Sequence, residues 1–342
     1  MGKVTLQSIA DKVGVSRMTV SNAFSRPDQL SAALRTRILE AADELGYVGP
    51  DPAARALARG RAGSVGLLLN GPLSEAFEDQ VSAEFVASVA DELAQRGMAL
   101  TVLTPPKDDT FVPARDVAID AALVYTCEPG SAGVEWLSRR ALPVVAVDQD
   151  LGAEVPAVRV DDRDGASQSA RHLLEHGHRR IGILALGVVG DDGVIGDSSS
   201  YPARERLSGW RETLAEAGVE PDVALAPYEP RAAAVDAARQ LLEGTDVTAV
   251  LCFSDVFARA VVLAAEELGR SVPGDVSVVG YDDSPLSVDS RPSLTTVRQD
   301  ITAKGHLAAG MLGDLLAGQP ATSQMLPATL VVRDSTGPVA GS

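Results

Sequence analysis

The sequence predicts an all-α head of about 60 residues, followed by an α/β body with two doubly wound parallel-sheet lobes. Short helical patterns, two of which are ended by a single glycine, occupy most of residues 1–61. From residue 64 onward, apolar strand-like runs alternate with amphipathic helical segments. At 342 residues, 45% hydrophobic and 23% charged, the chain exceeds one ordinary domain and has the composition of packed globular protein.

Charge is distributed unevenly between these two parts. The whole chain has a formal net charge of −17, yet residues 1–61 hold nine basic and six acidic side chains. Because phosphates are attracted by cations placed close to them, a mildly basic head on an acidic body fits local contact with DNA.

The first helix of the head is marked by four apolar residues spaced three and four apart. They are Leu6, Ile9, Ala10 and Val13. Thr5 is placed to cap this helix, and Gly14 is placed to end it in a left-handed conformation. Ser16 is placed to cap a second helix that runs to Phe24, and a third helix is expected over residues 31–45.

Two helices joined by a few residues around one glycine form the layout of a helix-turn-helix. In this motif the early residues of the second helix reach base edges, where Arg17 suits guanine, Asn22 suits adenine and Met18 suits a thymine methyl. Side chains suited to phosphates and base edges complete the predicted DNA-binding set in the head: Thr5, Ser16, Arg17, Met18, Thr19, Ser21, Asn22, Gln29 and Ser31. The alternative is a three-helix bundle whose polar face is only solvated.

The body repeats a strand–helix alternation. Strands are expected over residues 65–69, 99–103, 121–125, 144–147, 181–185, 249–253, 276–280 and 329–332. Helices are expected over residues 84–96, 167–176, 202–217, 232–242 and 256–268. This alternation implies parallel sheets, whose ligands lie beyond the carboxyl ends of the strands. Two such lobes would enclose a cleft that closes by hinge motion.

Polar side chains at strand ends are the candidates for a ligand pocket. Asp148, Ser254 and Asp282 follow predicted strands, and Arg204 opens a predicted helix. Carboxylates accept hydrogen bonds from paired sugar hydroxyls, and arginine donates in a fork. Tyr125, the last residue of a predicted strand, completes the candidate set.

Four other aspartates have a plainer interpretation. Asp255 and Asp283 also follow strands, but they could equally cap the helices that come next. Asp161 and Asp162 precede a helix and are interpreted as capping residues at a lobe boundary.

Several features argue against a metal, cofactor or enzyme site. His172 and His176 are spaced i, i+4 but lack a partner that would complete a metal site. The glycines of the Gly187–Ser200 segment form no phosphate-binding fingerprint, so we expect a surface loop or a flap of the cleft. No nucleophile with an adjacent base stands out. Cys127 and Cys252 lie in apolar runs and are expected as buried thiols.

The head resembles the lactose repressor (LacI/GalR) family through the run TLQSIADKVGVSRMTVSNAFSRPDQLSAALRTRILEAADELGY. The following PDPAARALARGRAGSVGLLL resembles the hinge and first core strand of that family. The resemblance implies a hinge that folds into a short helix on operator binding and places a leucine in the minor groove. Leu57 occupies that position, and Arg55 beside it joins the predicted DNA-binding set.

The body resembles the same family throughout, which implies the fold of a periplasmic sugar-binding protein with three crossovers between lobes. The resemblance places these crossovers near residues 160, 291 and 323, and it places effector contacts at Asp148, Arg204, Ser254 and Asp282. The expected domains are residues 1–48 for DNA binding, 49–62 for the hinge, 63–160 with 291–322 for one lobe, and 161–290 with 323–342 for the other.

These observations together predict a transcriptional repressor that is not an enzyme and needs no cofactor. Its partners are expected to be a pseudo-palindromic operator, a saccharide or polyol effector, and a second copy of the chain in a dimer or tetramer. No apolar run spans a bilayer and no secretory segment opens the chain, so a cytoplasmic location is expected. A regulator with a nucleobase corepressor and a solute-binding receptor are the alternatives.

Overall fold

The computed structural model describes residues 4–49, 51–71, 73–105, 110–127, 130–190, 193–229 and 231–339. The chain divides into two compact units, Met1–Gly63 and Ser64–Ser342. Within the described ranges, no helix is long and apolar enough to cross a membrane.

Every regular element in the described part of the first unit is helical. They are α1 (Leu6–Val13), α2 (Arg17–Ser25), a short 3-10 turn (Pro27–Gln29), α3 (Ala32–Glu44) and α4 (Pro52–Arg59). Thr5 and Ser8 form a capping box at the start of α1, and Gly14 ends that helix with φ 79°. Helices α1 to α3 bury one core made of Ile9, Ala10, Val20, Ala23, Ile38, Ala41 and Ala42. The predicted three-helix head is therefore confirmed.

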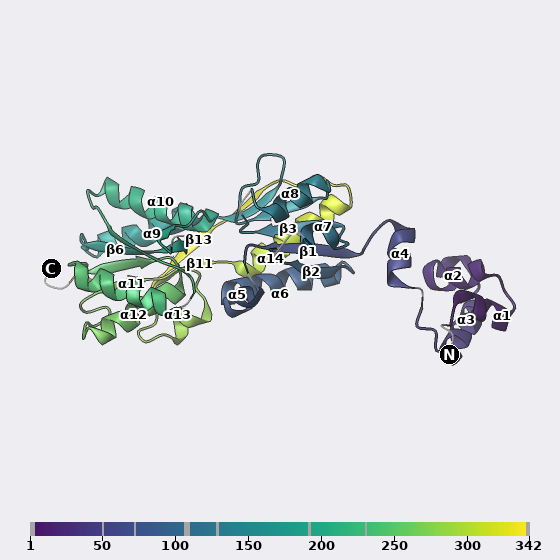
Figure 1. The fold of residues 1–342 in the computed structure, drawn as a ribbon. Coiled ribbons are helices and arrows are strands. Elements are labelled where there is room, and N and C mark those ends of the chain that lie inside the picture. Colours follow the sequence, from purple (N-terminus) through teal and green to yellow (C-terminus); the bar gives the residue numbers. More distant parts are fainter. Residues whose placement is uncertain are drawn as a thin grey trace. The chain divides into compact units, whose positions relative to one another are not determined.

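The second unit contains two α/β lobes, which lie side by side in Figure 1. The sheet of the first lobe has the strand order β12-β5-β4-β3-β1-β2, with every pairing parallel. Its strands are β1 (Ser64–Leu69), β2 (Ala99–Leu103), β3 (Ala121–Tyr125), β4 (Val144–Val147), β5 (Ala157–Val160) and β12 (Gln324–Leu326). Its helices are α5 (Leu73–Glu78), α6 (Gln80–Gln95), α7 (Pro113–Asp116), α8 (Ala132–Arg139) and α14 (Ile301–Leu316).

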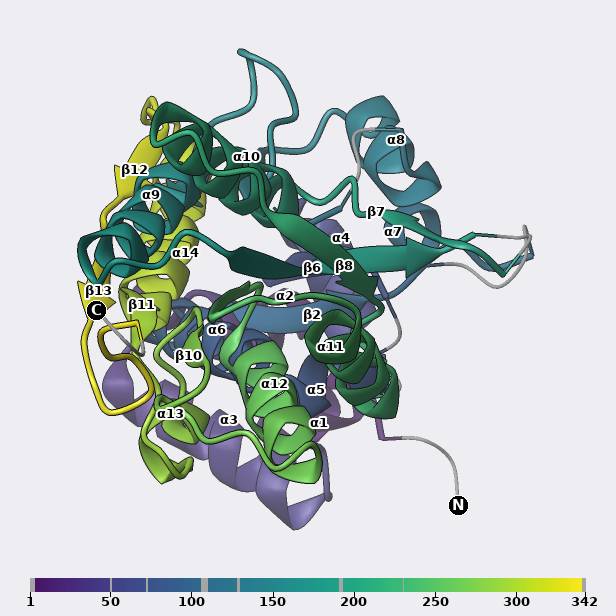
Figure 2. The same cartoon turned by 90° about the vertical axis from the view of Figure 1, so that its left-hand side faces the viewer.

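The sheet of the second lobe is centred on β6 (Ile181–Val189), which pairs in parallel with both β9 and β8. The other strands are β7 (Ile195–Asp197), β8 (Asp222–Ala226), β9 (Ala249–Cys252) and β10 (Ser277–Val279), with β11 (Thr296–Gln299) and β13 (Ala328–Val331) as a separate antiparallel pair. The helices are α9 (Asp162–Glu175), α10 (Tyr201–Glu216), α11 (Arg231–Gly244), α12 (Asp255–Glu267) and α13 (Pro285–Asp289). Figures 1 and 2 show α9 and α10 on one face of this sheet and α11 and α12 on the other.

The doubly wound body is therefore confirmed, but the chain crosses between lobes at points that differ in part from the expected ones. The first crossing, between β5 and α9, lies at Asp161 as expected. Strand β11 still belongs to the second lobe, because Arg298 forms a β-bridge with Asp282 of that lobe. The second crossing therefore falls after Gln299 and not near residue 291. Because β12 pairs with β5 of the first lobe and β13 with β11, the third crossing falls at Pro327 and not near residue 323.

The glycine-rich segment 187–200 contains regular strand in place of the irregular loop that the sequence suggested. Strand β6 continues to Val189 and pairs antiparallel with β7, so the segment begins as a hairpin. Gly187 is required there because a Cβ atom at this position would overlap Ile195 on the opposite strand. Residues 191 and 192 of this segment lie outside the described residues.

Candidate functional site

The first candidate site is the exposed face of α2 in the first unit. Arg17 and Met18 open this helix and are exposed, Met18 to 69%. Both side chains are therefore accessible to a partner molecule at the start of the helix.

The hydroxyl side chains predicted to contact phosphates are caps of the helices. Thr5 caps α1, Ser16 caps α2 and Ser31 caps α3, each by accepting a hydrogen bond from a backbone N–H three residues later. Thr19 is hydrogen-bonded to Ser16 through the two hydroxyls, 2.8 Å apart. Helix N-termini attract anions through their free N–H groups and dipole, so the capping role and a phosphate contact are compatible.

The remaining predicted DNA-contacting residues lie on α2, in the 3-10 turn that follows it, and on α4. Asn22 donates to Gln29 across 3.1 Å, so these two predicted contacts are bonded to each other. Ser21 is half-buried on α2. On α4, Arg55 is exposed and Leu57 is 85% exposed. An exposed leucine gains none of the free energy that burial gives an apolar side chain. This exposure suits a side chain that becomes buried only in a complex.

The second candidate site is a cavity of about 620 Å³ between the two lobes of the second unit. This volume lies in the range of small-molecule sites. Of the five predicted effector residues, Asp148, Ser254, Asp282 and Tyr125 line the cavity. They follow or end strands β3, β4, β9 and β10, so the cavity lies at the carboxyl ends of both parallel sheets.

The fifth predicted residue, Arg204, does not line the cavity, and Arg206 takes its place. Helix α10 buries a stripe that includes Pro202, Arg206 and Trp210, whereas Arg204 is on the exposed side of the helix. The i, i+4 and i+8 spacing of that stripe was the signal in the sequence that could have distinguished the two arginines.

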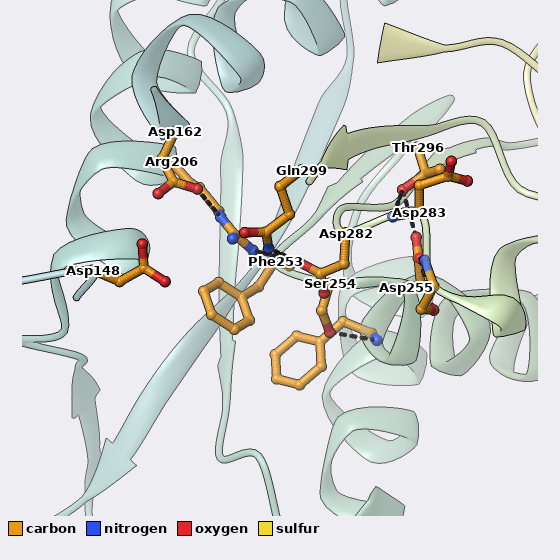
Figure 3. Close-up of polar contacts among 12 residues, drawn as sticks. Asp148, Asp162, Arg206, Phe253, Ser254, Asp255, Asp282, Asp283, Thr296 and Gln299 are labelled. Atoms are coloured by element: carbon orange, nitrogen blue, oxygen red, sulfur yellow. Dashed lines mark hydrogen bonds and ion pairs between the residues drawn. The ribbon is translucent and has the colours of Figure 1, made fainter. Parts of the chain in front are cut away.

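Arg206 is 4% exposed and is held by carboxylates and aromatic rings. Its Nε donates to Asp162 at 2.8 Å, and its Nη1 lies 3.4 Å from Asp282 and 2.6 Å from the carbonyl oxygen of Phe253. Its guanidinium carbon lies 3.6 Å from the centre of the Tyr281 ring. Figure 3 shows the side chains of Asp162, Arg206 and Asp282 close to one another. Asp162 is therefore a buried ion-pair partner as well as the first residue of α9.

Asp282 lies at the centre of this network. Its backbone has φ 106°, a conformation that non-glycine residues adopt rarely, and Gln299 donates to its carboxylate at 2.7 Å. Burial raises the pKa of the Asp282 carboxyl to about 8, although the nearby Arg206 acts to lower it. Backbone strain and a raised pKa at one residue are typical of functional sites.

The floor of the cavity on the first lobe is formed by Asp148 and Lys304. The Nζ of Lys304 donates to the Asp148 carboxylate and, at 3.0 Å, to the side-chain oxygen of Gln299. Lys304 lies on α14, a helix that the periodicity of the sequence did not reveal because its apolar residues surround it on all sides. Gln299 was likewise missed, since nothing local marks it.

Aromatic side chains and a hydrogen bond between lobes complete the walls. Tyr125 is stacked on Phe85 with ring centres 4.4 Å apart, and burial raises the pKa of its phenol well above the ordinary value. Ser254 caps α12. At the mouth, Tyr228 of the second lobe donates to Asp79 of the first lobe at 2.7 Å.

The plainer interpretation fits Asp255 and Asp283. Asp255 accepts hydrogen bonds from Ser284 and Thr296, and Figure 3 shows it turned away from Arg206 toward Thr296. Asp283 forms ion pairs with Arg298 and Arg333. Neither residue lines the main cavity. Asp161 caps α9 as expected.

His172 on α9 and His178 just after it have structural partners. His172 is hydrogen-bonded to Thr336, and His178 to Thr248 and to the carbonyl oxygen of Gly337. Burial lowers the pKa of both imidazoles. Among the described residues, no group of three or more His, Cys, Asp or Glu side chains is arranged to hold a metal ion. Cys127 and Cys252 are buried free thiols.

A helix-turn-helix unit joined to a two-lobed unit with a polar cleft defines a class of bacterial transcription regulators. Residues 5–49 match the family described as bacterial regulatory proteins, lacI family, and residues 170–336 match a periplasmic binding protein-like domain. The chain is 36% identical over 324 residues to the HTH-type transcriptional regulator IpsA of Corynebacterium glutamicum, with 90% of each chain covered. The chain therefore belongs to the LacI family of transcriptional regulators.

Solved structures are similar over nearly the whole chain. A complex of the transcriptional regulator CelR with cellobiose has a TM-score of 0.71 and 30% identity, and covers 97% of this chain and 100% of that one. A Lac repressor dimer bound to operator and the anti-inducer ONPF has a TM-score of 0.82 and 26% identity, and covers 98% of this chain and 100% of that one.

Proposed function

We propose that this regulator is a repressor that binds a pseudo-palindromic operator as a homodimer, and that a sugar or polyol in the cleft controls its affinity for DNA. The observation that carries the proposal is the cavity of about 620 Å³, lined by acidic, basic and hydroxyl side chains from both lobes, in a chain that also has a helix-turn-helix unit. A ligand that contacts both lobes favours one lobe arrangement over another.

The DNA-binding part of the proposal rests on α2 and α4. Arg17 is free to form a paired hydrogen bond with guanine, and Met18 offers an apolar contact at the exposed start of α2. The capped N-termini of the three head helices suit phosphates. The exposed Leu57 suits insertion between base pairs. Two copies would read two half-sites, as dimers with this motif do.

The effector part rests on the chemistry of the cavity. Asp148 and Asp282 can accept hydrogen bonds from hydroxyls, and Arg206 can donate them. The related CelR is bound to cellobiose in its solved complex. Effector and operator must influence each other reciprocally if both bind states that differ in lobe arrangement.

The DNA-reading role is tested on duplexes selected by the wild-type protein from a randomised pool. We expect inverted half-sites in the selected duplexes. Arg17→Ala should lose about 1–3 kcal/mol of binding per half-site, which is roughly 5- to 150-fold, on the selected duplex and far less on random DNA. Arg37→Ala removes the same charge from α3 and is the matched control. Equal losses for both variants on both DNAs would contradict base reading by Arg17.

The effector role is tested by titrating sugars, hexitols and purines while the anisotropy of labelled operator is followed. Arg206→Lys keeps the charge but loses the forked geometry, so the response should need at least about tenfold more ligand. Arg204→Lys, two residues away on the exposed side of α10, should behave as the wild type. A response to purines alone would replace the sugar with a nucleobase. An unchanged response in Arg206→Lys would remove the cavity from the mechanism.

A further inference from the structure

The floor of the cavity holds a buried carboxylate with one unused oxygen. Asp148 is 3% exposed, and its Oδ2 accepts a hydrogen bond from Lys304. Its Oδ1 has no hydrogen-bond partner among the described residues and is shielded from the surface. A buried acceptor without a partner lowers the stability of the fold. A ligand that donates a hydrogen bond to this oxygen would remove that cost.

The backbone at Asp148 is also constrained. Its φ of 49° is in the left-handed region, where a residue with a side chain is disfavoured. Directly after β4, this conformation fixes the carboxylate beside the cavity, and Figure 3 shows it pointing toward the group around Arg206. Strain of this kind persists where the surrounding structure holds a side chain for a function.

Lys304 is the cation that faces Asp148. It is 1% exposed, and its Nζ has two hydrogen bonds, to Asp148 and to Gln299, although an ammonium group has three protons to donate. The pair therefore has no net charge, and it keeps one acceptor and one donor without a partner among the described residues. A hydroxyl group, which both donates and accepts, matches this pair.

Among the described lining residues, each cation of the cavity is already paired with a carboxylate. The described lining residues include two cations, Lys304 and Arg206, against four carboxylates. Arg206 is already held by Asp162 and Asp282. A phosphate or carboxylate would enter beside carboxylates, where each cation is already paired with a carboxylate, so its loss of hydration would not be fully compensated. An ammonium group would meet Lys304 on the floor.

We infer that the Lys304–Asp148 pair is a specificity element that restricts the cavity to uncharged polyhydroxylated ligands. The inference rests on the proposed function, because it takes the cavity as the effector site. Lys304 acts by cancelling the charge of Asp148 while leaving one oxygen free. Without that cancellation the same floor would attract amines.

The test uses ligand sets that share a skeleton and differ only in charge. Glucose, glucosamine, gluconate and glucose 6-phosphate form one set, and matching sets are built on galactose, cellobiose and sorbitol. Binding to the full-length protein is measured by calorimetry, with operator anisotropy in parallel. In the wild type, a neutral member should bind at least about tenfold more tightly than its charged derivatives.

Two variants shift the charge of the floor in opposite directions. Lys304→Met keeps the apolar stem and frees the Asp148 charge, so the amino derivative should gain at least about tenfold relative to its parent sugar. Asp148→Asn frees Lys304, so the carboxylate or phosphate derivative should gain instead. Lys12→Met in the first unit is the control and should keep the wild-type ranking. If one cavity variant fails to fold, the other decides.

The results separate this inference from the proposed function. A charged ligand that binds the wild type and changes operator affinity overturns the inference and supports the proposed function. An unchanged ranking in the folded cavity variants also overturns the inference. A neutral ligand that binds by the expected ranking without changing operator affinity supports the inference and overturns the proposed function. If no member of any set binds, both are overturned.

Discussion

Replacing Arg206 with methionine should strongly destabilise the second unit. The change leaves Asp162 and Asp282 buried without their cation, since their side chains are only 1% and 10% exposed. Removing one partner of a buried ion pair costs about 3–5 kcal/mol. For a unit of this size each kcal/mol lowers the melting temperature by roughly 2–4 °C, so we expect a fall of about 6–20 °C.

Thermal unfolding followed by circular dichroism gives the measurement, with Arg204→Met as the matched control on the exposed side of the same helix. Adding Asp162→Asn to Arg206→Met should restore part of the loss, because one uncompensated charge is removed. The deficit should also shrink on acidification from pH 7.5 to 5.5, since the isolated carboxyls can then bind protons. A melting temperature for Arg206→Met within 2 °C of the control, about the effect of 1 kcal/mol, would refute the reasoning.

Three further predictions concern packing, the contact between lobes, and pH. Gly209→Ala should cost about 1–3 kcal/mol of unfolding free energy, because its Cβ would overlap the carbonyl oxygen of Arg163, whereas Gly244→Ala meets nothing within 4 Å and should be neutral or stabilising in urea melts. Tyr228→Phe removes the 2.7 Å hydrogen bond to Asp79 and should lower stability by about 0.5–1.5 kcal/mol and speed amide hydrogen exchange at the cavity mouth; unchanged exchange would argue that this bond does not hold the lobes. Because burial lowers the pKa of His172 and His178, the unfolded chain protonates these imidazoles first, so their effect is to reduce stability as pH falls below about 6.5. The raised pKa of Asp282 has the opposite effect, since it increases stability as pH falls from about 8 toward the ordinary value of an aspartate. The histidine effect is therefore isolated by comparing His178→Gln with the wild type. The melting temperature of the variant should fall less between pH 7.5 and 5.5.

The helices of the first unit were largely predictable because their signals are local. Thr5, Gly14 and Ser16 act within one turn of their own positions, and the apolar spacing of α1 to α3 directly indicates which sides face one core. The same holds for strands such as β2, β3 and β4, whose bounds agree with the expected runs because buried parallel strands are short continuous apolar segments.

The cleft was predictable only in outline. Asp148 and Asp282 follow strands, and the rule that ligands lie at the carboxyl ends of parallel sheets places them at a site without further information. Arg204 is the candidate that the sequence suggests, because it lies near the start of a predicted helix. That position does not show which face of the helix is buried. The choice between Arg204 and Arg206 required the packing of α10 on α9, which the contact between Gly209 and Arg163 fixes.

The sequence by itself determined the two kinds of unit, the helices of the first unit and the carboxylates at the strand ends, because each follows from residues within a few positions of one another. Only the tertiary structure decided how those carboxylates are compensated. Asp148 and Lys304 are separated by 156 residues, and they meet because the chain crosses back into the first lobe after β11. Such pairing depends on topology, which no local pattern of residues reports.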